Sequence, residues 1–172
     1  MSTDTLPAAV RELIGRTQYE ETSSFPIEMG YAYTSCASVQ NGNPLYWQPA
    51  VAEALTGGAI LPPSLLSAWF RPHYWQPGAS GEQLALQTHF DLKRLLDLPE
   101  AIIAGSETVF GEPVRPGDVL TTRQVVRSIS EPKTTRVGHG RFWVIEVTIT
   151  NQRGEWVGTD SYDCFGYRRP QS

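Results

Sequence analysis

The sequence has few charged residues and no strong excess of either sign. Charged residues make up 19% of the 172 residues, and 18 acidic against 14 basic side chains leave a net charge of −4. Binding to nucleic-acid phosphates requires a basic surface, so this composition argues against a nucleic-acid partner. Hydrophobic residues make up 40%, which is typical of a folded globular protein and not of a disordered one.

Long apolar runs and a secretion signal are also missing. No stretch approaches the ~20 apolar residues that cross a bilayer, and residues 1–9 lack the charged and apolar regions of a signal peptide. The two cysteines, Cys36 and Cys164, share no motif spacing, so we expect buried, reduced thiols instead of a disulfide or a nucleophile. We therefore expect one cytoplasmic domain over residues 1–172, with no membrane partner.

Helix signals concentrate in the first 71 residues. Capping prolines and closing glycines predict a short helix within residues 1–14, a second over 26–37 and a third over 49–55. A fourth begins at Pro62-Pro63 and ends before Pro72. Its side chains are apolar nearly all round, so we expect a sheet to bury it on every side.

Strand signals dominate the second half of the chain. Alternating apolar residues predict a strand over 142–150. A hairpin loop at 151–154 predicts its partner strand over 157–167. Further strands are expected over 119–130, after the turn at 115–118, and over 104–112. Residues 72–103 are the least regular part, with turn signals and a helix-like stretch at 92–96. We expect an irregular insert or lid there, because long loops in compact domains are usually functional. The fold class that these signals predict is α+β.

The segment from Asn41 to Tyr46, with the sequence Asn-Gly-Asn-Pro-Leu-Tyr, resembles the hydratase signature of the MaoC-like dehydratase family. That signature reads Asp, any residue, Asn, Pro, Ile or Leu, His. The stretches 58–65, 110–118 and 150–157 also resemble this family in order and spacing. The resemblance covers roughly residues 13–168 and is closest to the N-terminal, often non-catalytic dehydratase domain, similar to that of fungal fatty-acid synthase.

The resemblance implies a hot-dog fold, in which an antiparallel sheet wraps around a long central helix, and it implies subunits that work in pairs. The family hydrates enoyl thioesters of coenzyme A or acyl carrier protein, or dehydrates the 3-hydroxy forms. Its aspartate and histidine handle the water and its protons, while backbone N–H groups at the central helix hold the thioester oxygen. The resemblance implies no metal and no cofactor beyond the carrier that belongs to the substrate.

The residues at the catalytic positions cannot perform this chemistry. Hydration needs a base that accepts a proton from water and an acid that protonates the α-carbon. Asn41 stands at the aspartate position, and an amide is no base near neutral pH. Tyr46 stands at the histidine position, and a phenol with a pKa of about 10 is a poor base. Pro62 and Pro63 stand where catalytic members have a His-Gly pair, and proline has no N–H to donate.

Several of these residues also have a purely structural interpretation. Residues 41–46 carry Asn-Gly and Asn-Pro pairs, which favour turns, so this segment is either a degenerate site or a turn with no catalytic ancestry. His73 and His89 are candidate catalytic groups or ordinary structural histidines. His139 is expected in a hairpin loop, and Asp118 is expected to cap a turn.

We expect the acyl group to contact an aromatic cluster at the end of the fourth helix. The candidate substrate-binding residues are Trp69, Phe70, His73, Tyr74, Trp75 and Arg115. The aromatic side chains either pack in the core or line a pocket for a large apolar group. Arg115 either contacts a coenzyme A phosphate or is a solvated turn residue.

Together these observations predict a non-catalytic, pocket-forming subunit of a heteromeric enoyl-CoA hydratase or 3-hydroxyacyl thioester dehydratase. A MaoC-like catalytic subunit would complete a heterodimer or heterotetramer, and a bulky fatty or steroid side-chain acyl-CoA would be the substrate. Two alternatives stay open. The chain is an independently active enoyl-CoA hydratase using His73 or a carboxylate of residues 72–103, or it is a thioester-binding homodimer without catalysis.

Overall fold

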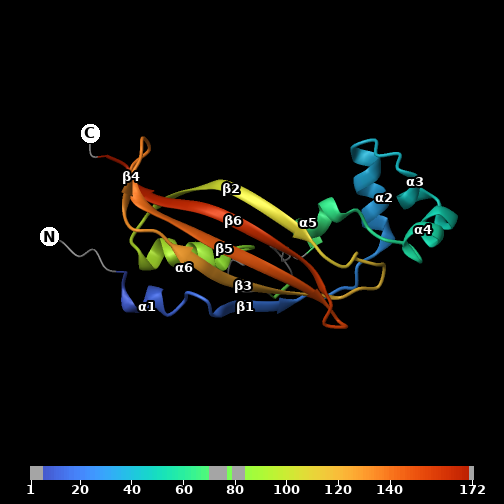
Figure 1. Cartoon of the computed structure of the whole chain (residues 1–172), viewed down its shortest axis with the longest axis horizontal. Helices are drawn as coiled ribbons and strands as arrows, with labels where there is room; N and C mark the ends of the chain where they lie inside the picture. Colours follow the sequence, from blue (N-terminus) through green and yellow to red (C-terminus); the bar gives the residue numbers. More distant parts are fainter. Residues whose placement is uncertain (1–5, 70–76, 79–83, 171–172) are drawn as a thin grey trace.

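The computed structural model describes residues 6–69, 77–78 and 84–170 (Figure 1). The helices are α1 (Ala8–Arg11), α2 (Met29–Ser38), α3 (Pro44–Trp47), α4 (Pro49–Thr56), the 3-10 turn η1 (Pro63–Leu65), α5 (Leu66–Trp69) and α6 (Gln87–Leu95). The strands are β1 (Thr17–Thr22), β2 (Glu100–Phe110), β3 (Leu120–Ile129), β4 (Lys133–Thr134), β5 (His139–Asn151) and β6 (Trp156–Arg168). The predicted α+β class is confirmed.

The strands form one antiparallel sheet of six strands in the order β1-β3-β5-β6-β2, with β4 paired to β5. The long strands β5 and β6 lie at its centre and form a hairpin. The loop between them closes as predicted, with Gly154 in the left-handed region at φ 77°. The four predicted strands correspond to β2, β3, β5 and β6, with ends that differ by a few residues because strand ends carry weak sequence signals.

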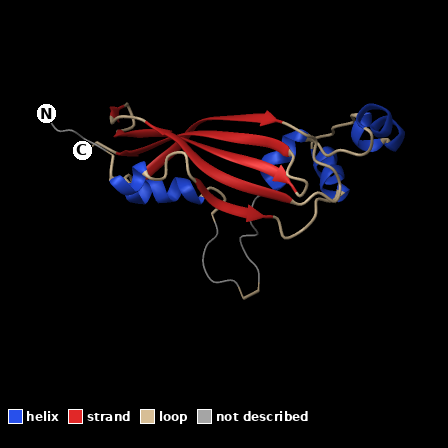
Figure 2. Ribbon diagram, turned by 60° about the horizontal axis from the view of Figure 1, so that its bottom comes forward, coloured by secondary structure: helices blue, strands red, loops and turns tan. Residues whose placement is uncertain are grey.

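Helices α1 and α6 cover one face of the sheet, which we call the inner face (Figures 1 and 2). Two groups of buried apolar side chains lie on this face. The α6 cluster consists of Val10, Leu92, Leu98, Val126, Trp143, Ile145 and Cys164. The α5 cluster lies toward the other end and consists of Ile27, Ala32, Leu61, Leu66, Val114, Leu120, Val147, Ile149 and Val157.

Helices α2, α3 and α4 extend beyond the end of the sheet that lies farthest from α1 (Figure 1). Helix α4 ends as the sequence predicts, because Gly57 takes the left-handed conformation at φ 62° and closes the last turn. Together the three helices carry the segment from Asn41 to Tyr46 away from the centre of the sheet.

Two expectations from the sequence are wrong in part. In the described turns of the fourth helix, η1 and α5, only Leu66 is fully buried, and Ser64 and Ala68 are exposed. This helix begins at the end of the sheet, so the sheet does not surround it there. Within the expected irregular insert at 72–103, helix α6 extends from Gln87 to Leu95, whereas a helix-like stretch was expected at 92–96, and β2 begins at Glu100. The packing of Leu92 on the sheet accounts for this order.

Strand β1 was not predicted, because its sequence Thr-Gln-Tyr-Glu-Glu-Thr has no apolar alternation. It pairs with β3 through an irregular register between Gln18 and Glu21, where Tyr19 has a φ of 47°. The Tyr19 hydroxyl donates a hydrogen bond to Asp91 on α6. This contact raises the pKa of Tyr19 and joins the edge strand to the helix below it.

Asp118 caps its turn as predicted. Its carboxylate accepts the backbone N–H of Arg115 at 2.8 Å, and the side chains of Gln152 at 3.1 Å and Arg153 at 2.9 Å. The carboxylate is almost fully buried, so these charge-assisted bonds offset its desolvation. They join the turn before β3 to the loop of the central hairpin.

Gly166 should be indispensable for packing the α6 cluster. A methyl group added at Gly166 would overlap the indole of Trp143, which is fully buried beneath α6. We expect Gly166→Ala to lower the free energy of unfolding by roughly 1–3 kcal/mol, measured by denaturant titration. Gly30→Ala in α2 is the matched control, because nothing lies within 4 Å of the added carbon. Equal losses in both variants would contradict the predicted overlap.

Candidate functional site

The segment from Asn41 to Trp47 is held by its own polar groups. The Asn41 side-chain oxygen accepts the N–H of Asn43 at 3.0 Å, and the Asn43 side chain accepts the N–H of Leu45 at 3.0 Å as the cap of α3. The Trp47 indole donates to the Asn41 carbonyl at 2.7 Å. The Asn41 amide therefore stabilises a turn, which is the structural role that its sequence allowed.

Tyr46 lies half-buried in α3 and is a poorer base than a free phenol. Burial raises its pKa above 10, and the nearby Cys36 raises it further. A phenol with a raised pKa stays protonated at neutral pH, so it cannot accept a proton from water in place of a histidine. At both positions of the hydratase signature, the local chemistry therefore disfavours acid–base catalysis.

The helix start that would hold a thioester oxygen is blocked by proline. Pro62 is buried and precedes η1, and Pro63 is the first residue of that turn. An oxyanion is stabilised by N–H groups aimed at it, and neither proline has one.

Arg115 is occupied by contacts within the chain. Its guanidinium donates to the carbonyl of Thr56 at 2.6 Å and to that of Ala59 at 3.4 Å. These bonds hold the end of α4 against the turn before β3. They account for the position of the side chain without a ligand, and its contact with coenzyme A stays a prediction.

Of the remaining substrate-binding candidates, the structure describes only Trp69. Trp69 ends α5, is half-buried and packs against the α5 cluster. The other four predicted residues, Phe70, His73, Tyr74 and Trp75, lie outside the described residues, as do residues 72–76 and 79–83 of the expected lid.

His89 is held in an apolar environment on α6. Its ring lies 5.4 Å from that of Trp143 and 5.3 Å from that of Phe90, between ring centroids. Its Nδ1 atom is buried without a hydrogen-bond partner. Burial, with a smaller contribution from Lys93, lowers the pKa of His89 to about 4. The imidazole is therefore neutral at physiological pH and a weak base.

Both cysteines are buried in the core of the described structure. Cys36 and Cys164 are both free and buried, as predicted. Burial raises the pKa of Cys164 to about 11, and Asp163 adds to this effect, so the thiol stays protonated at neutral pH. Among the described residues, no three metal-binding side chains lie together, and no helix has the length and apolar character to cross a bilayer.

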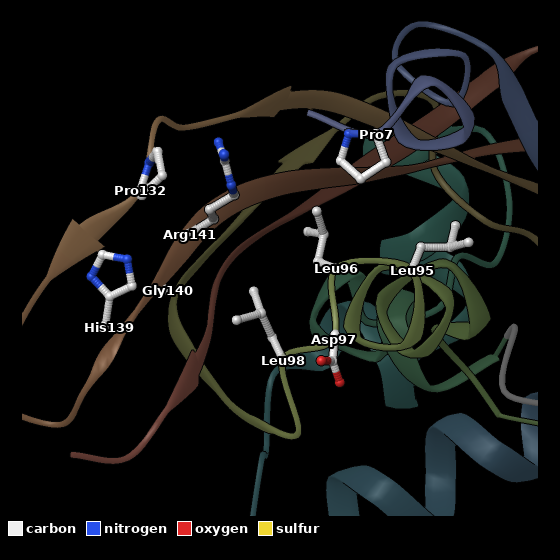
Figure 3. A pocket seen from close by; sticks show the side chains of 9 residues that line it. All are labelled: Pro7, Leu95, Leu96, Asp97, Leu98, Pro132, His139, Gly140 and Arg141. Atoms are coloured by element: carbon white, nitrogen blue, oxygen red, sulfur yellow. The ribbon is translucent and has the colours of Figure 1, made fainter. Parts of the chain in front are cut away.

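A cavity of about 230 Å³ lies at the end of the sheet near α1 (Figure 3). Helices α2–α4 lie at the opposite end of the molecule from α1 (Figure 1). It is lined by Pro7, Leu95, Leu96, Asp97, Leu98, Pro132, His139, Gly140 and Arg141. His139 begins β5 and contacts the Thr134 hydroxyl at 2.9 Å, next to the turn in which it was expected. Of the predicted site residues that the structure describes, namely Asn41, Tyr46, Trp69 and Arg115, none lines this cavity.

Sequence reasoning missed two features that carry functional weight. The first is Asp160, a fully buried carboxylate on the inner face of β6. The second is the apolar character of β2, which forms an edge of the sheet. The only sequence signal for Asp160 was an acidic residue within the strand expected at 157–167.

The fold and the altered signature define a hot-dog protein of the hydratase and dehydratase class. Residues 13–160 match the family described as FAS1-like, dehydratase domain region, and the chain belongs to this family. It is 27% identical over 179 residues to a probable enoyl-CoA hydratase alpha subunit of Thermomonospora curvata. That alignment covers 98% of this chain and 54% of the relative, so the chain spans about half the length of that protein.

Solved structures show the same MaoC-like hot-dog fold. A chain of the ChsH1-ChsH2 complex from Mycobacterium tuberculosis matches with a TM-score of 0.77 at 17% identity, covering 95% of this chain and 92% of that one. A chain of the HadBC dehydratase complex from the same organism gives 0.58 at 20%, covering 88% and 96%. A MaoC-like dehydratase from Rhodospirillum rubrum gives 0.56 at 20%, covering 91% and 95%. The predicted fold is thereby confirmed.

The low pKa of His89 predicts a loss of stability in acid. The unfolded chain binds a proton near pH 6.5 and the folded chain only near pH 4. The unfolded state therefore gains protons first, so stability is complete above about pH 6.5 and falls as the pH approaches 4. We expect His89→Phe to remove roughly 1–2 kcal/mol of this loss, measured by denaturant titrations across the interval. His139→Phe is the control at an exposed position. An unchanged slope in His89→Phe would refute the assignment.

Proposed function

We propose that this chain is the non-catalytic, pocket-forming subunit of a heteromeric enoyl-CoA hydratase or 3-hydroxyacyl thioester dehydratase. A MaoC-like partner chain supplies the aspartate and histidine. The substrate is a thioester of coenzyme A or acyl carrier protein with a bulky fatty or steroid side-chain acyl group, which places the protein in lipid metabolism. The two free buried thiols support a reducing compartment, the cytoplasm.

The observation that carries this proposal is that the residues at the catalytic positions cannot act as the base or as the backbone oxyanion donors. The Asn41 amide is used within its turn, and the pKa of Tyr46 is raised above its ordinary value. The Pro62-Pro63 pair removes two backbone donors where the thioester oxygen would be held. The residues that usually activate water, transfer protons and stabilise the oxyanion are therefore replaced in this chain. Another subunit has to supply these groups.

The two edges of the sheet differ, and only the β2 edge is suited to binding a partner subunit. Strand β1 is short, carries Glu20 and Glu21, and has an irregular register, which are features that protect an edge from pairing. Strand β2 has 11 residues and, within the described part of the chain, pairs with β6 alone. Its exposed apolar side chains are Ile102, Ile103, Val109 and Phe110, which are 44–57% exposed. Such an edge is suited to pairing with a strand of the partner.

The relatives are consistent with this assembly. Two of the similar solved structures are complexes of two different chains, and one of these is a 3R-hydroxyacyl-ACP dehydratase. The curated relative is described as an alpha subunit, a term for one chain of several. We therefore expect the native partner to be a MaoC-like chain with an intact aspartate and histidine.

Activity should depend on the partner. The chain is purified from its native cells with its bound proteins, and activity is measured on crotonyl-CoA and on longer enoyl-CoAs. We expect the complex to hydrate enoyl-CoA, and the chain alone to be inactive. Turnover by the chain alone would instead favour an independently active hydratase, and binding without turnover by a homodimer would favour the remaining alternative.

Removing the polar groups of Asn41 and Tyr46 should leave the turnover of the assembled complex nearly unchanged. We expect Asn41→Ala and Tyr46→Phe to change kcat/KM of the assembled complex by less than about tenfold, equal to ~1.4 kcal/mol of barrier. The corresponding changes to the aspartate and histidine of the partner provide the comparison. A thousandfold loss in either variant, with assembly intact, would mean that this segment is a working site.

A charge on the β2 edge should prevent assembly. Ile103 is 57% exposed in the isolated chain, and burying a lysine there without a counter-charge is costly. We expect Ile103→Lys to weaken binding of the partner by at least about tenfold, or ~1.4 kcal/mol, in a titration. Thr17→Lys on β1 is the matched control at the other edge. Full affinity in Ile103→Lys would exclude β2 as the interface.

A further inference from the structure

A line of side chains crosses the inner face of the sheet from β3 to β2. Gln124 on β3 lies opposite Val147 on β5, Val147 lies opposite Asp160 on β6, and Asp160 lies opposite Thr108 on β2. Directly opposed residues of antiparallel strands point to the same face. Val147 belongs to the α5 cluster, so the whole line faces the core. We call Gln124, Asp160 and Thr108 the polar row.

The polar row separates the two apolar clusters. On β5, Ile149 belongs to the α5 cluster and Ile145 to the α6 cluster, with Val147 between them. On β3, Leu120 and Val126 belong to different clusters on either side of Gln124. Polar side chains thus lie on the inner face between the two clusters, where Leu86 and Tyr162 pack against both clusters.

Asp160 is the most demanding member of the row. It is 2% exposed. One carboxylate oxygen accepts the Thr108 hydroxyl at 2.6 Å, and the other accepts the Tyr162 hydroxyl at a long 3.4 Å. Both donors are neutral, and no lysine or arginine of the described residues forms an ion pair with it. A carboxylate accepts about four hydrogen bonds, so this one has capacity for a further donor.

The side-chain hydroxyl of Thr88, which lies near the row, is buried without a hydrogen-bond partner. Gln124, which is 5% exposed, accepts the N–H of Thr88 on α6 at 3.1 Å. The Thr88 side chain is 1% exposed, and its hydroxyl has no hydrogen-bond partner. Buried polar groups are normally satisfied, so an unpartnered hydroxyl beside this row indicates a missing partner. The spacing of adjacent strands puts Gln124 and Asp160 about 10 Å apart, two strand separations.

We propose that the polar row recognises a hydroxyl group on the tail of the acyl thioester, with Asp160 accepting its hydrogen bond. This inference rests on the proposed function, and it narrows the substrate to hydroxylated acyl chains. The apolar clusters on either side keep water from the row, so a hydrogen bond to the carboxylate is stronger than in solvent. A hydroxyl suits the site because its neighbours are themselves hydroxyls and an amide.

Binding of saturated acyl-CoA to the native complex tests the row without turnover. The probes are acyl-CoAs of one chain length that carry a hydroxyl on successive tail carbons, with the unsubstituted acyl-CoA as reference, in calorimetric titrations. Because Asp160 is fixed in the sheet, we expect one position of the hydroxyl to bind at least about tenfold more tightly than the reference. The same preference is expected in kcat/KM for the matching enoyl-CoAs.

Asp160→Asn keeps the shape of the side chain and replaces one acceptor oxygen with an amide donor, so the preference for that hydroxyl should fall to less than about threefold, equal to ~0.7 kcal/mol. Asp163→Asn is the matched control, because Asp163 lies on the same strand and is exposed. If Asp160→Asn unfolds before binding can be measured, the comparison of hydroxylated acyl-CoAs on the wild-type complex tests the proposal instead.

The failures of the two proposals are distinguishable. Equal binding of all hydroxylated and unsubstituted acyl-CoAs by an active complex would overturn the role of the polar row and leave the proposed function standing. A preference that survives in folded Asp160→Asn would also overturn it. No binding of any acyl-CoA, together with no hydration by the complex, would overturn both.

Discussion

The pairing of β5 with β6 fixes the position of nearly every other element. These two strands have 13 residues each, and the loop that joins them is closed by Asn151, whose side chain accepts the N–H groups of Arg153 and Glu155. Strand β3 pairs with the free side of β5, and β2 pairs with the free side of β6. Because side chains alternate along a strand, a shift of one residue in this hairpin would exchange the inner and outer faces.

The register of the hairpin also determines where polar groups meet. Val147 faces Asp160 only because the hairpin closes at Asn151, and the same alignment places Gln124 and Thr108 in line with them. These residues are far apart in the sequence. The clusters on either side then exclude water from a position that no single stretch of the chain would mark as a site.

The sequence was most informative where local chemistry decides the structure. Gly57 ends α4, Asp118 caps its turn and Gly154 closes the hairpin, because each of these features depends on a few adjacent residues. The signature segment was located by its pattern, and the structure showed how the Asn41 amide is used. Strand β1 escaped prediction because its exposed, polar residues are held in place by pairing with β3.

Features that depend on long-range packing could not be predicted in the same way. Helix α6 packs on the sheet through Leu92, which is part of the α6 cluster. A short apolar run in the sequence does not show which residues it will contact. Asp160 was visible as a residue, but its burial follows from the strands on both sides. The apolar side chains of β2 were visible too, but their exposure follows from the position of that strand in the sheet order.

The unequal edges of the sheet limit how it can grow. A sheet with two open edges can add strands at both and so build fibres of unlimited length. In this chain the β1 edge is short and charged, and only β2 presents a long apolar edge. One added strand would occupy that edge, and a similar hot-dog subunit joined through its own open edge would leave only the short β1-type edges exposed. Growth of the sheet through β2 would therefore stop at two subunits by geometry, without a further factor.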